Sequence, residues 1–249
     1  MPPCQSYDMF DRDCFITHNC NSRAQTKKKN LLQTVILIWI AQFLTFSSFV
    51  SFLGIIGKDE IFKHTIQLNA EYYTPVDGEL IPLGTVQSVS NTPFDLRIPQ
   101  VMGDIIGSIN FNIHKELKML IKTLEIVKFP LEMRSGYDHN FVIWPTNKML
   151  SAIGQNRFVA RSVHVPSGRT LDVYSNQPGV QFYTGNQLPS WKEESLLGKN
   201  GSVYEQFGGF CLETQMYPNA VNEKNFGLKS ILNPGEIYYH NVMYVFGTV

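Results

Sequence analysis

Short segments in which apolar and polar residues alternate, separated by turn residues, recur through residues 58–249 of the chain. Alternation with a period of two places successive side chains on opposite faces of a β-strand. Many such segments at regular spacing predict an all-β fold, an antiparallel β-sandwich. The predicted strands cover residues 61–70, 80–89 (as a short pair), 136–144, 158–165, 170–175, 177–184, 210–215 and 236–246. The Pro/Gly turn at residues 166–169 predicts a hairpin.

One internal stretch follows the helical period instead. Between residues 104 and 134, apolar residues recur at helical spacing with lysines on the other faces, which predicts one inserted amphipathic helix. The apolar positions are Ile113, Leu117, Leu120, Ile121, Leu124 and Val127. A surface insertion with one packed stripe is the preferred interpretation, ahead of a binding device.

The first 57 residues divide into two parts of opposite character. Residues 1–30 are polar, lack periodicity and end in three lysines, so we expect a disordered N-terminus. Residues 31–57 contain no charged side chain and exceed the roughly 20 apolar residues that a transmembrane helix needs. They predict a hydrophobic helix, a candidate single-pass membrane anchor with the lysines on the cytoplasmic side. The alternative is that part of this run, rich in Phe, Val and Ser, is a buried strand.

Composition narrows the class of ligand. The chain has 249 residues, zero formal net charge and 43% hydrophobic residues. Such a balance gives no indication of a nucleic-acid partner, and a neutral sugar would fit it. Cys4, Cys14, Cys20 and Cys211 follow no zinc-binding or disulfide pattern, so we expect no metal site and a reduced, cytoplasmic environment.

The strongest candidate for chemistry is Glu213, a lone carboxylate that follows the apolar residues Phe210, Cys211 and Leu212. Apolar neighbours remove water from a carboxylate, raise its pKa and favour proton transfer near neutral pH. The alternative is a solvent-facing glutamate on a half-buried strand.

Three short sequence motifs resemble those of a known family. Residues 209–222 read GFCLETQMYPNAVN, residues 176–186 read NQPGVQFYTGN, and residues 136–141 read GYDHNF. Together they resemble the aldose 1-epimerase (galactose mutarotase) family, over roughly the C-terminal three-fifths of a typical member. The resemblance implies a mutarotase-like supersandwich that is N-terminally incomplete here. It also implies an isomerase that interconverts the anomers of aldohexoses such as galactose and glucose, without a cofactor.

Mutarotation requires a base at the anomeric hydroxyl, an acid at the ring oxygen and polar groups that hold the other hydroxyls. By resemblance, Glu213 is the catalytic base, while Asp138 and Gln177 bind the sugar. A turn-capping role is the structural alternative for Asp138. His139 neighbours Asp138 on a predicted strand and should therefore point to the opposite face.

One departure from the family bears on activity. The resemblance places the family's acid histidine at Ser48, and a serine cannot protonate a ring oxygen at neutral pH. The family's N-terminal portion, with its further Arg and His sugar contacts, has no counterpart in the sequence. The alternatives to an active epimerase are therefore a carbohydrate-binding remnant without catalysis and a truncated product.

Overall fold

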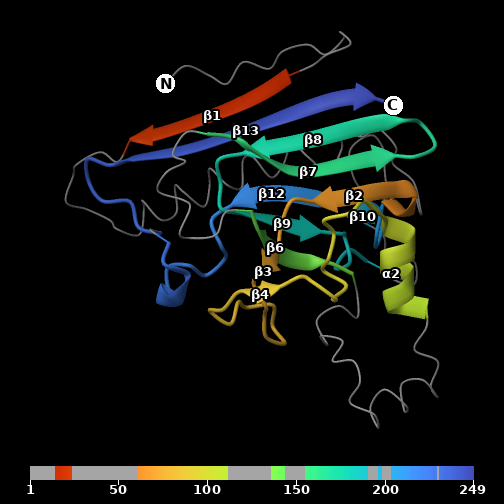
Figure 1. The fold of residues 1–249 in the computed structure, drawn as a ribbon, viewed down its shortest axis with the longest axis horizontal. Helices are drawn as coiled ribbons and strands as arrows, with labels where there is room; N and C mark the ends of the chain where they lie inside the picture. Colours follow the sequence, from red (N-terminus) through yellow and green to blue (C-terminus); the bar gives the residue numbers. More distant parts are fainter. Residues whose placement is uncertain are drawn as a thin grey trace.

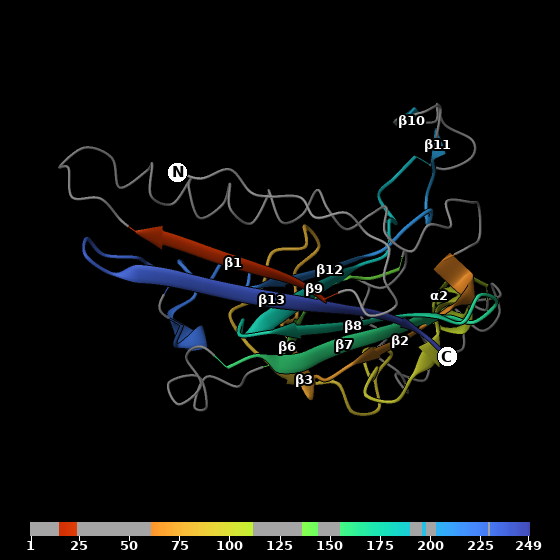
Figure 2. The same ribbon diagram turned by 90° about the horizontal axis from the view of Figure 1, so that it is seen from above.

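Two antiparallel β-sheets face each other in the computed structural model (Figures 1 and 2). The structure describes residues 15–23, 61–111, 136–143, 155–189, 196–197, 203–228 and 230–249. Within these ranges nearly all regular structure is strand, and every strand pair is antiparallel. The prediction of an all-β, antiparallel fold is confirmed.

The first sheet has six strands in the order β1-β13-β8-β7-β2-β5. Their bounds are β1 Phe15–Arg23, β13 Ile237–Thr248, β8 Arg169–Ser175, β7 Arg157–His164, β2 His64–Leu68 and β5 Gln100–Val101. The predicted hairpin is β7 and β8, which pair from Arg157 opposite Ser175 to His164 opposite Arg169. A short 3-10 helix, η1 (Ile61–Lys63), precedes β2.

The second sheet has five strands in the order β12-β9-β6-β3-β4. Their bounds are β12 Cys211–Gln215, β9 Gly179–Tyr183, β6 Asp138–Val142, β3 Tyr72–Tyr73 and β4 Gln87–Ser88. A separate two-stranded ribbon, β10 (Leu196–Leu197) with β11 (Val203–Tyr204), projects away from the two sheets in Figure 2. A second 3-10 helix, η5 (Lys224–Phe226), lies between β12 and β13.

Two local predictions differ from the structure. Phe15–Arg23, in the segment expected to be disordered, forms β1 and pairs with β13 along its whole length. Backbone hydrogen bonds to an open strand edge can order a polar segment, and the composition of that segment gives no sign of the edge. Tyr72–Tyr73 is a strand rather than part of a turn, since it fills the position between β6 and β4.

The helical predictions are tested only in part. Helix α2 runs from Met102 to Phe111, so it begins slightly before the predicted insertion, and it buries Met102 and Ile106 one turn apart. The predicted stripe from residue 113 to 127 and the hydrophobic run 31–57 lie outside the described residues. Among the residues that the structure describes, no helix has the length and apolar character needed to cross a membrane.

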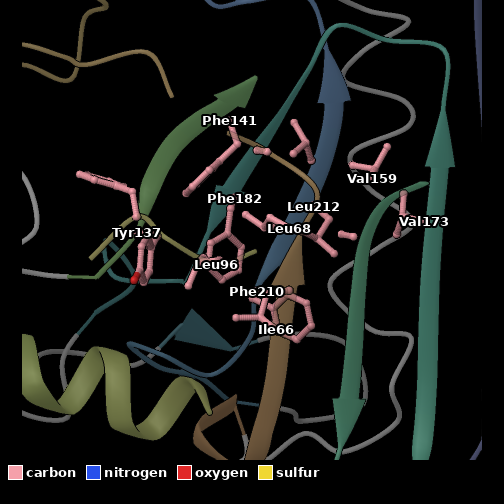
Figure 3. Close-up of a cluster of buried hydrophobic side chains, with 14 of the residues drawn as sticks. Ile66, Leu68, Leu96, Tyr137, Phe141, Val159, Val173, Phe182, Phe210 and Leu212 are labelled. Atoms are coloured by element: carbon pink, nitrogen blue, oxygen red, sulfur yellow. The ribbon is translucent and has the colours of Figure 1, made fainter. Parts of the chain in front are cut away.

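Both sheets contribute to one hydrophobic core (Figure 3). Inward-facing residues of β2 and β8 come from the first sheet, and inward-facing aromatic and aliphatic residues of β6, β9 and β12 come from the second. They include Ile66, Leu68, Leu171, Val173, Phe141, Phe182 and Leu212, all at most 2% exposed. Because this core occupies the inner face of the five-stranded sheet, the alternate side chains of β6, β9 and β12 point away from it.

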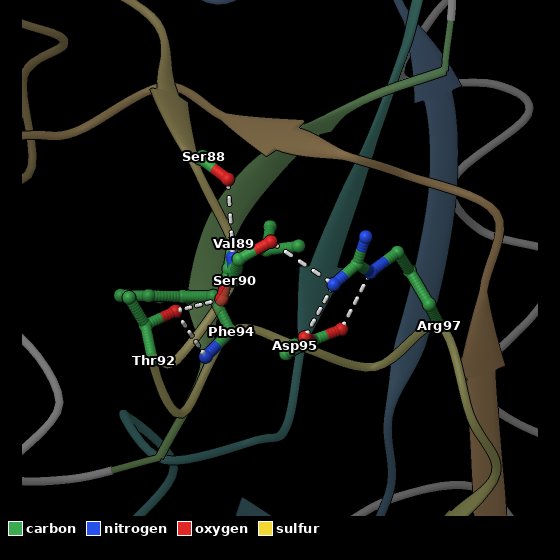
Figure 4. A network of polar contacts seen from close by, with 7 residues as sticks. All are labelled: Ser88, Val89, Ser90, Thr92, Phe94, Asp95 and Arg97. Carbon is green, nitrogen blue, oxygen red and sulfur yellow. Dashed lines mark hydrogen bonds and ion pairs between the residues drawn. The ribbon is translucent and has the colours of Figure 1, made fainter.

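The connection between β4 and β5 inserts an aromatic side chain into that core (Figure 4). Phe94 is fully buried, and its backbone N–H donates to Thr92 Oγ1 at 3.1 Å. Arg97 clamps the loop from outside, donating to both Asp95 oxygens at 2.8 and 2.7 Å and to Ser90 Oγ at 3.0 Å. The Arg97 hydrogen bond lowers the pKa of Asp95. The polar clamp is exposed, so its main effect is to fix the loop that carries Phe94.

Candidate active site

The outer face of the five-stranded sheet carries two rows of polar side chains. The strand register sets each row, because directly opposed residues on neighbouring strands share a face. The first row places Glu213 opposite Gln181, and Gln181 opposite Asn140. The second row places Cys211 opposite Tyr183, and Tyr183 opposite Asp138.

Glu213 occupies the centre of β12, between the buried residues Leu212 and Thr214. Burial of its carboxyl group raises its pKa from 4.5 to about 7, and the negative charge of Asp138 adds to the rise. A carboxylate with this pKa can both take up and release a proton near neutral pH.

Asp138, at the start of β6, is held by two side-chain amides. Gln181 Nε2 donates to Oδ1 at 2.8 Å, and Gln187 Nε2 donates to Oδ2 at 3.0 Å. Burial raises the pKa of Asp138, while the hydrogen bond from Gln181 opposes that rise. The two neighbouring carboxyl groups therefore sit in different environments, since the amide donors favour the ionised form of Asp138.

Tyr183 and Cys211 complete the second row. The Tyr183 hydroxyl accepts a hydrogen bond from the Gln187 backbone N–H at 3.1 Å, which ties the following loop to β9. Burial raises the pKa of Tyr183 and raises that of the free Cys211 thiol to about 12. Cys211 therefore stays protonated and is a poor nucleophile at neutral pH.

Two amide oxygens on this face, Gln181 Oε1 and Asn140 Oδ1, are buried and have no hydrogen-bond partner among the described residues. An unpaired buried acceptor costs free energy. The outer face therefore combines a carboxyl group of raised pKa with buried polar side-chain atoms.

Gly179, at the start of β9, leaves room for the Asn140 side chain because it has no Cβ atom. A Cβ atom at this position would meet Asn140 Oδ1 within a forbidden distance and the Tyr217 ring at 3.1 Å. Asn140 is 1% exposed and cannot swing aside. Gly179→Ala should therefore lower the free energy of unfolding by about 1–3 kcal/mol, the usual cost of overpacking.

Chemical denaturation of the variant measures that loss. Gly78→Ala is the matched control, because a Cβ atom there meets nothing within 4 Å. Equal stabilities of the two variants would contradict the close packing of Asn140 over Gly179.

The structure brings together two of the three predicted site residues. Glu213 and Asp138 share the outer face, and their roles as base and sugar ligand stay predictions. Gln177 lies two residues before β9, is 4% exposed, and donates from Nε2 to Asn176 Oδ1 at 3.2 Å and to the Tyr239 carbonyl at 3.4 Å. Its role as a sugar ligand stays a prediction.

Sequence reasoning overlooked Gln181 and Gln187. The alternation of β9 contained a signal for Gln181, since residues 179, 181 and 183 must share a face if Phe182 enters the core. No such signal marks Gln187, because it lies in a loop and reaches Asp138 only through the tertiary fold. His139 points to the core, opposite Asp138, as predicted.

Three other histidines are buried away from the polar rows. His64 and His164 lie opposite each other on adjacent strands of the first sheet, with their rings tilted and the centroids 4.7 Å apart. His240, on β13, contacts Thr214 Oγ1 through Nε2 at 3.0 Å. Ser48 lies outside the described residues. Within the described ranges, no three His, Cys, Asp or Glu side chains gather so as to hold a metal ion.

The structure is an antiparallel two-sheet fold that carries two carboxyl groups, Glu213 and Asp138, on the outer face of one sheet. The model of the family aldose 1-epimerase matches residues 52–245. The galactose mutarotases of Sus scrofa and Rattus norvegicus are 38% and 39% identical to the chain over 190 residues, which make up 76% of this chain and 45% of each relative. The chain belongs to the aldose 1-epimerase family.

The fold agrees with that assignment. The crystal structure of the GalM/aldose epimerase homologue from C. elegans superposes with a TM-score of 0.54 at 21% identity, covering 79% of this chain and 49% of the other. The chain thus spans a little under half the length of the curated relatives that it matches.

Proposed function

We propose that the polar rows form the base side of an aldose 1-epimerase site, which interconverts the α and β anomers of aldohexoses such as galactose and glucose. The observation that carries the proposal is the placement of Glu213 on the same face as the amide-held Asp138, one strand away across β9. Burial also raises the pKa of Glu213 to about 7. The family membership of the chain supports the reaction class.

In the proposed reaction Glu213 removes the proton from the anomeric hydroxyl, while an acid delivers a proton to the ring oxygen. The bond between the anomeric carbon and the ring oxygen breaks and leaves the open aldehyde. Rotation of the carbonyl carbon and reversal of both proton transfers close the ring on the other face. A base with a pKa near the operating pH suits both directions, since it must accept and return one proton in each turnover.

Asp138 is proposed to hold a sugar hydroxyl. Each of its oxygens accepts one amide hydrogen, and an ionised carboxylate has further lone pairs to offer. Gln181 supports this role because it holds Asp138 Oδ1 from the neighbouring strand. Gln177 remains a proposed ligand from the family resemblance alone.

A second candidate is a carbohydrate-binding remnant. The observation in its favour is that His64, His139, His164 and His240 are all at most 6% exposed, so none of them stands free on the polar face to act as the acid. The resemblance also places the family's acid at Ser48. A remnant would bind aldoses without accelerating their mutarotation.

Polarimetry of a chimera, together with polarimetry and a binding measurement on the full chain, distinguishes the two candidates. With freshly dissolved α-galactose, an epimerase accelerates the change in optical rotation beyond the buffer rate. Because the resemblance places the family's acid at Ser48, we expect little acceleration by the unmodified chain, together with measurable galactose binding by ligand-observed NMR. Catalysis is expected in a chimera in which residues 58–249 replace the matching region of the Sus scrofa mutarotase. Absence of both binding and chimera activity would reject the proposal.

In that chimera, the pH dependence of kcat/KM should show an acidic limb near pH 7, with the rate falling below it as Glu213 becomes protonated. Asp138→Asn should move the limb to lower pH, since the Asp138 charge raises the pKa of Glu213. Burial, the larger cause, remains, so the limb should stay above 4.5. A limb that does not move would mean that the two carboxyl groups are uncoupled.

A further inference from the structure

In the part of the chain that the structure describes, the start of β6 has no neighbouring strand on its β3 side. Thr74 N–H donates to the Asn140 carbonyl at 3.0 Å, whereas Thr184 N–H donates to the Tyr137 carbonyl at 3.0 Å from the β9 side. Because backbone groups alternate in direction along a strand, the N–H of Asp138 points toward β3, as the backbone groups of Asn140 do. β3 ends at Tyr73, too early to reach Asp138.

His139 replaces the missing strand partner. Its Nδ1 accepts a hydrogen bond from the Asp138 backbone N–H at 3.1 Å. The contact requires a neutral imidazole with its proton on Nε2, because a protonated ring has no acceptor. Burial lowers the pKa of His139 to about 4, so the ring is neutral at physiological pH.

Stability alone does not explain a histidine at this position. The ring is 1% exposed and lies among aromatic side chains, with its centroid 4.8 Å from that of Phe94. Its Nε2 is buried without a hydrogen-bond partner among the described residues. An apolar ring would fill the space without that unpaired polar atom. Compared with an apolar ring, the imidazole adds the acceptor for the Asp138 backbone N–H.

We propose that His139 is a positioning residue, whose imidazole Nδ1 holds the main chain of Asp138 so that its carboxylate stays between Gln181 and Gln187 at the sugar site. As far as Asp138 binds sugar, this inference rests on the proposed function. The hydrogen bond itself, and its effect on the Asp138 amide, do not depend on it.

Two substitutions separate positioning from packing. His139→Phe keeps a ring against Phe94 and removes the acceptor. His139→Asn places Oδ1 close to the position of Nδ1 but leaves a cavity beyond it. We expect the Phe variant to keep its melting temperature, lose about tenfold in galactose affinity and exchange the Asp138 amide about tenfold faster, which is the usual effect of losing a hydrogen bond to a buried group. The Asn variant should melt earlier yet keep galactose affinity within about twofold.

A purely structural role would make affinity follow the melting temperature in both variants, and that result would overturn the inference. His164→Phe, a buried histidine of the other sheet, is the control and should change neither galactose affinity nor exchange at Asp138. Imidazole ¹⁵N shifts of the unmodified chain give a test that does not depend on variant folding. The inference requires the Nε2–H tautomer, and a proton on Nδ1 would reject it. If the unmodified chain binds no galactose but His139→Phe still releases the Asp138 amide, the proposed function fails while the positioning role stands.

Discussion

Glu213→Gln is expected to slow mutarotation by the chimera roughly 100- to 10,000-fold, the usual contribution of a positioned acid–base group. The amide cannot accept the anomeric proton, yet it has nearly the same shape as the carboxyl group. Burial already favours the uncharged form of Glu213, so the neutral amide should leave the fold intact. Polarimetry over a range of galactose concentrations should show the loss in kcat rather than in KM.

Glu205→Gln provides the matched control. This glutamate lies between β11 and β12, outside the polar rows, and the same substitution there should leave the rate within about twofold, as expected for a group that takes no part in proton transfer. Near-normal mutarotation in the Glu213 variant would rule that residue out as the base. A joint loss of rate in both variants would indicate a general effect of the substitutions on the fold.

The largest expected effect on stability follows from Phe94. Its ring stacks on Tyr73 with centroids 4.1 Å apart and makes edge contacts with the rings of Tyr137, His139 and Phe141. Phe94→Ala removes the ring from a fully buried position and should lower the free energy of unfolding by about 3–5 kcal/mol. Denaturant titration of the full chain, followed by fluorescence, measures that loss.

Ile98→Ala is the comparison, since Ile98 follows the same loop and is 71% exposed. Its expected cost is below about 0.5 kcal/mol, as for a surface substitution. If Phe94→Ala cost no more than Ile98→Ala, the loop could not be an anchor of the core. The prediction also bears on the site. The hydroxyl of Tyr137, the residue immediately before Asp138, donates to the carbonyl of Pro93 in this loop at 2.7 Å.

The fold class could be predicted because alternation is a local property of each strand. Val173 and Leu171 alternate with polar neighbours on β8, and a turn of Pro and Gly precedes them, so the hairpin with β7 followed from nearby residues alone. The strand at Tyr72–Tyr73 could not be predicted in the same way. It is only two residues long, and it is a strand because β6 and β4 lie on either side.

The candidate site also has one property that follows from neighbouring residues and another that depends on the tertiary fold. The unusual environment of Glu213 was visible in the apolar residues before it, because a carboxyl group in the middle of a buried strand loses water whatever else the fold does. The second cause of the raised pKa of Glu213 is the negative charge of Asp138, which lies on a strand 75 positions earlier in the chain. Only the fold brings the two carboxyl groups together, on the strands at either side of β9.

The sequence by itself determined the antiparallel β architecture, the apolar surroundings of the Glu213 carboxyl group and the opposite directions of Asp138 and His139, since each follows from period-two alternation and from immediate neighbours. The tertiary structure decided which amides hold Asp138, where β3 ends and which atom accepts the hydrogen bond of the Asp138 backbone N–H. Gln187 and His139 have these roles because loop and strand ends meet in space, and the alternation of residues along the chain does not record where a neighbouring strand stops.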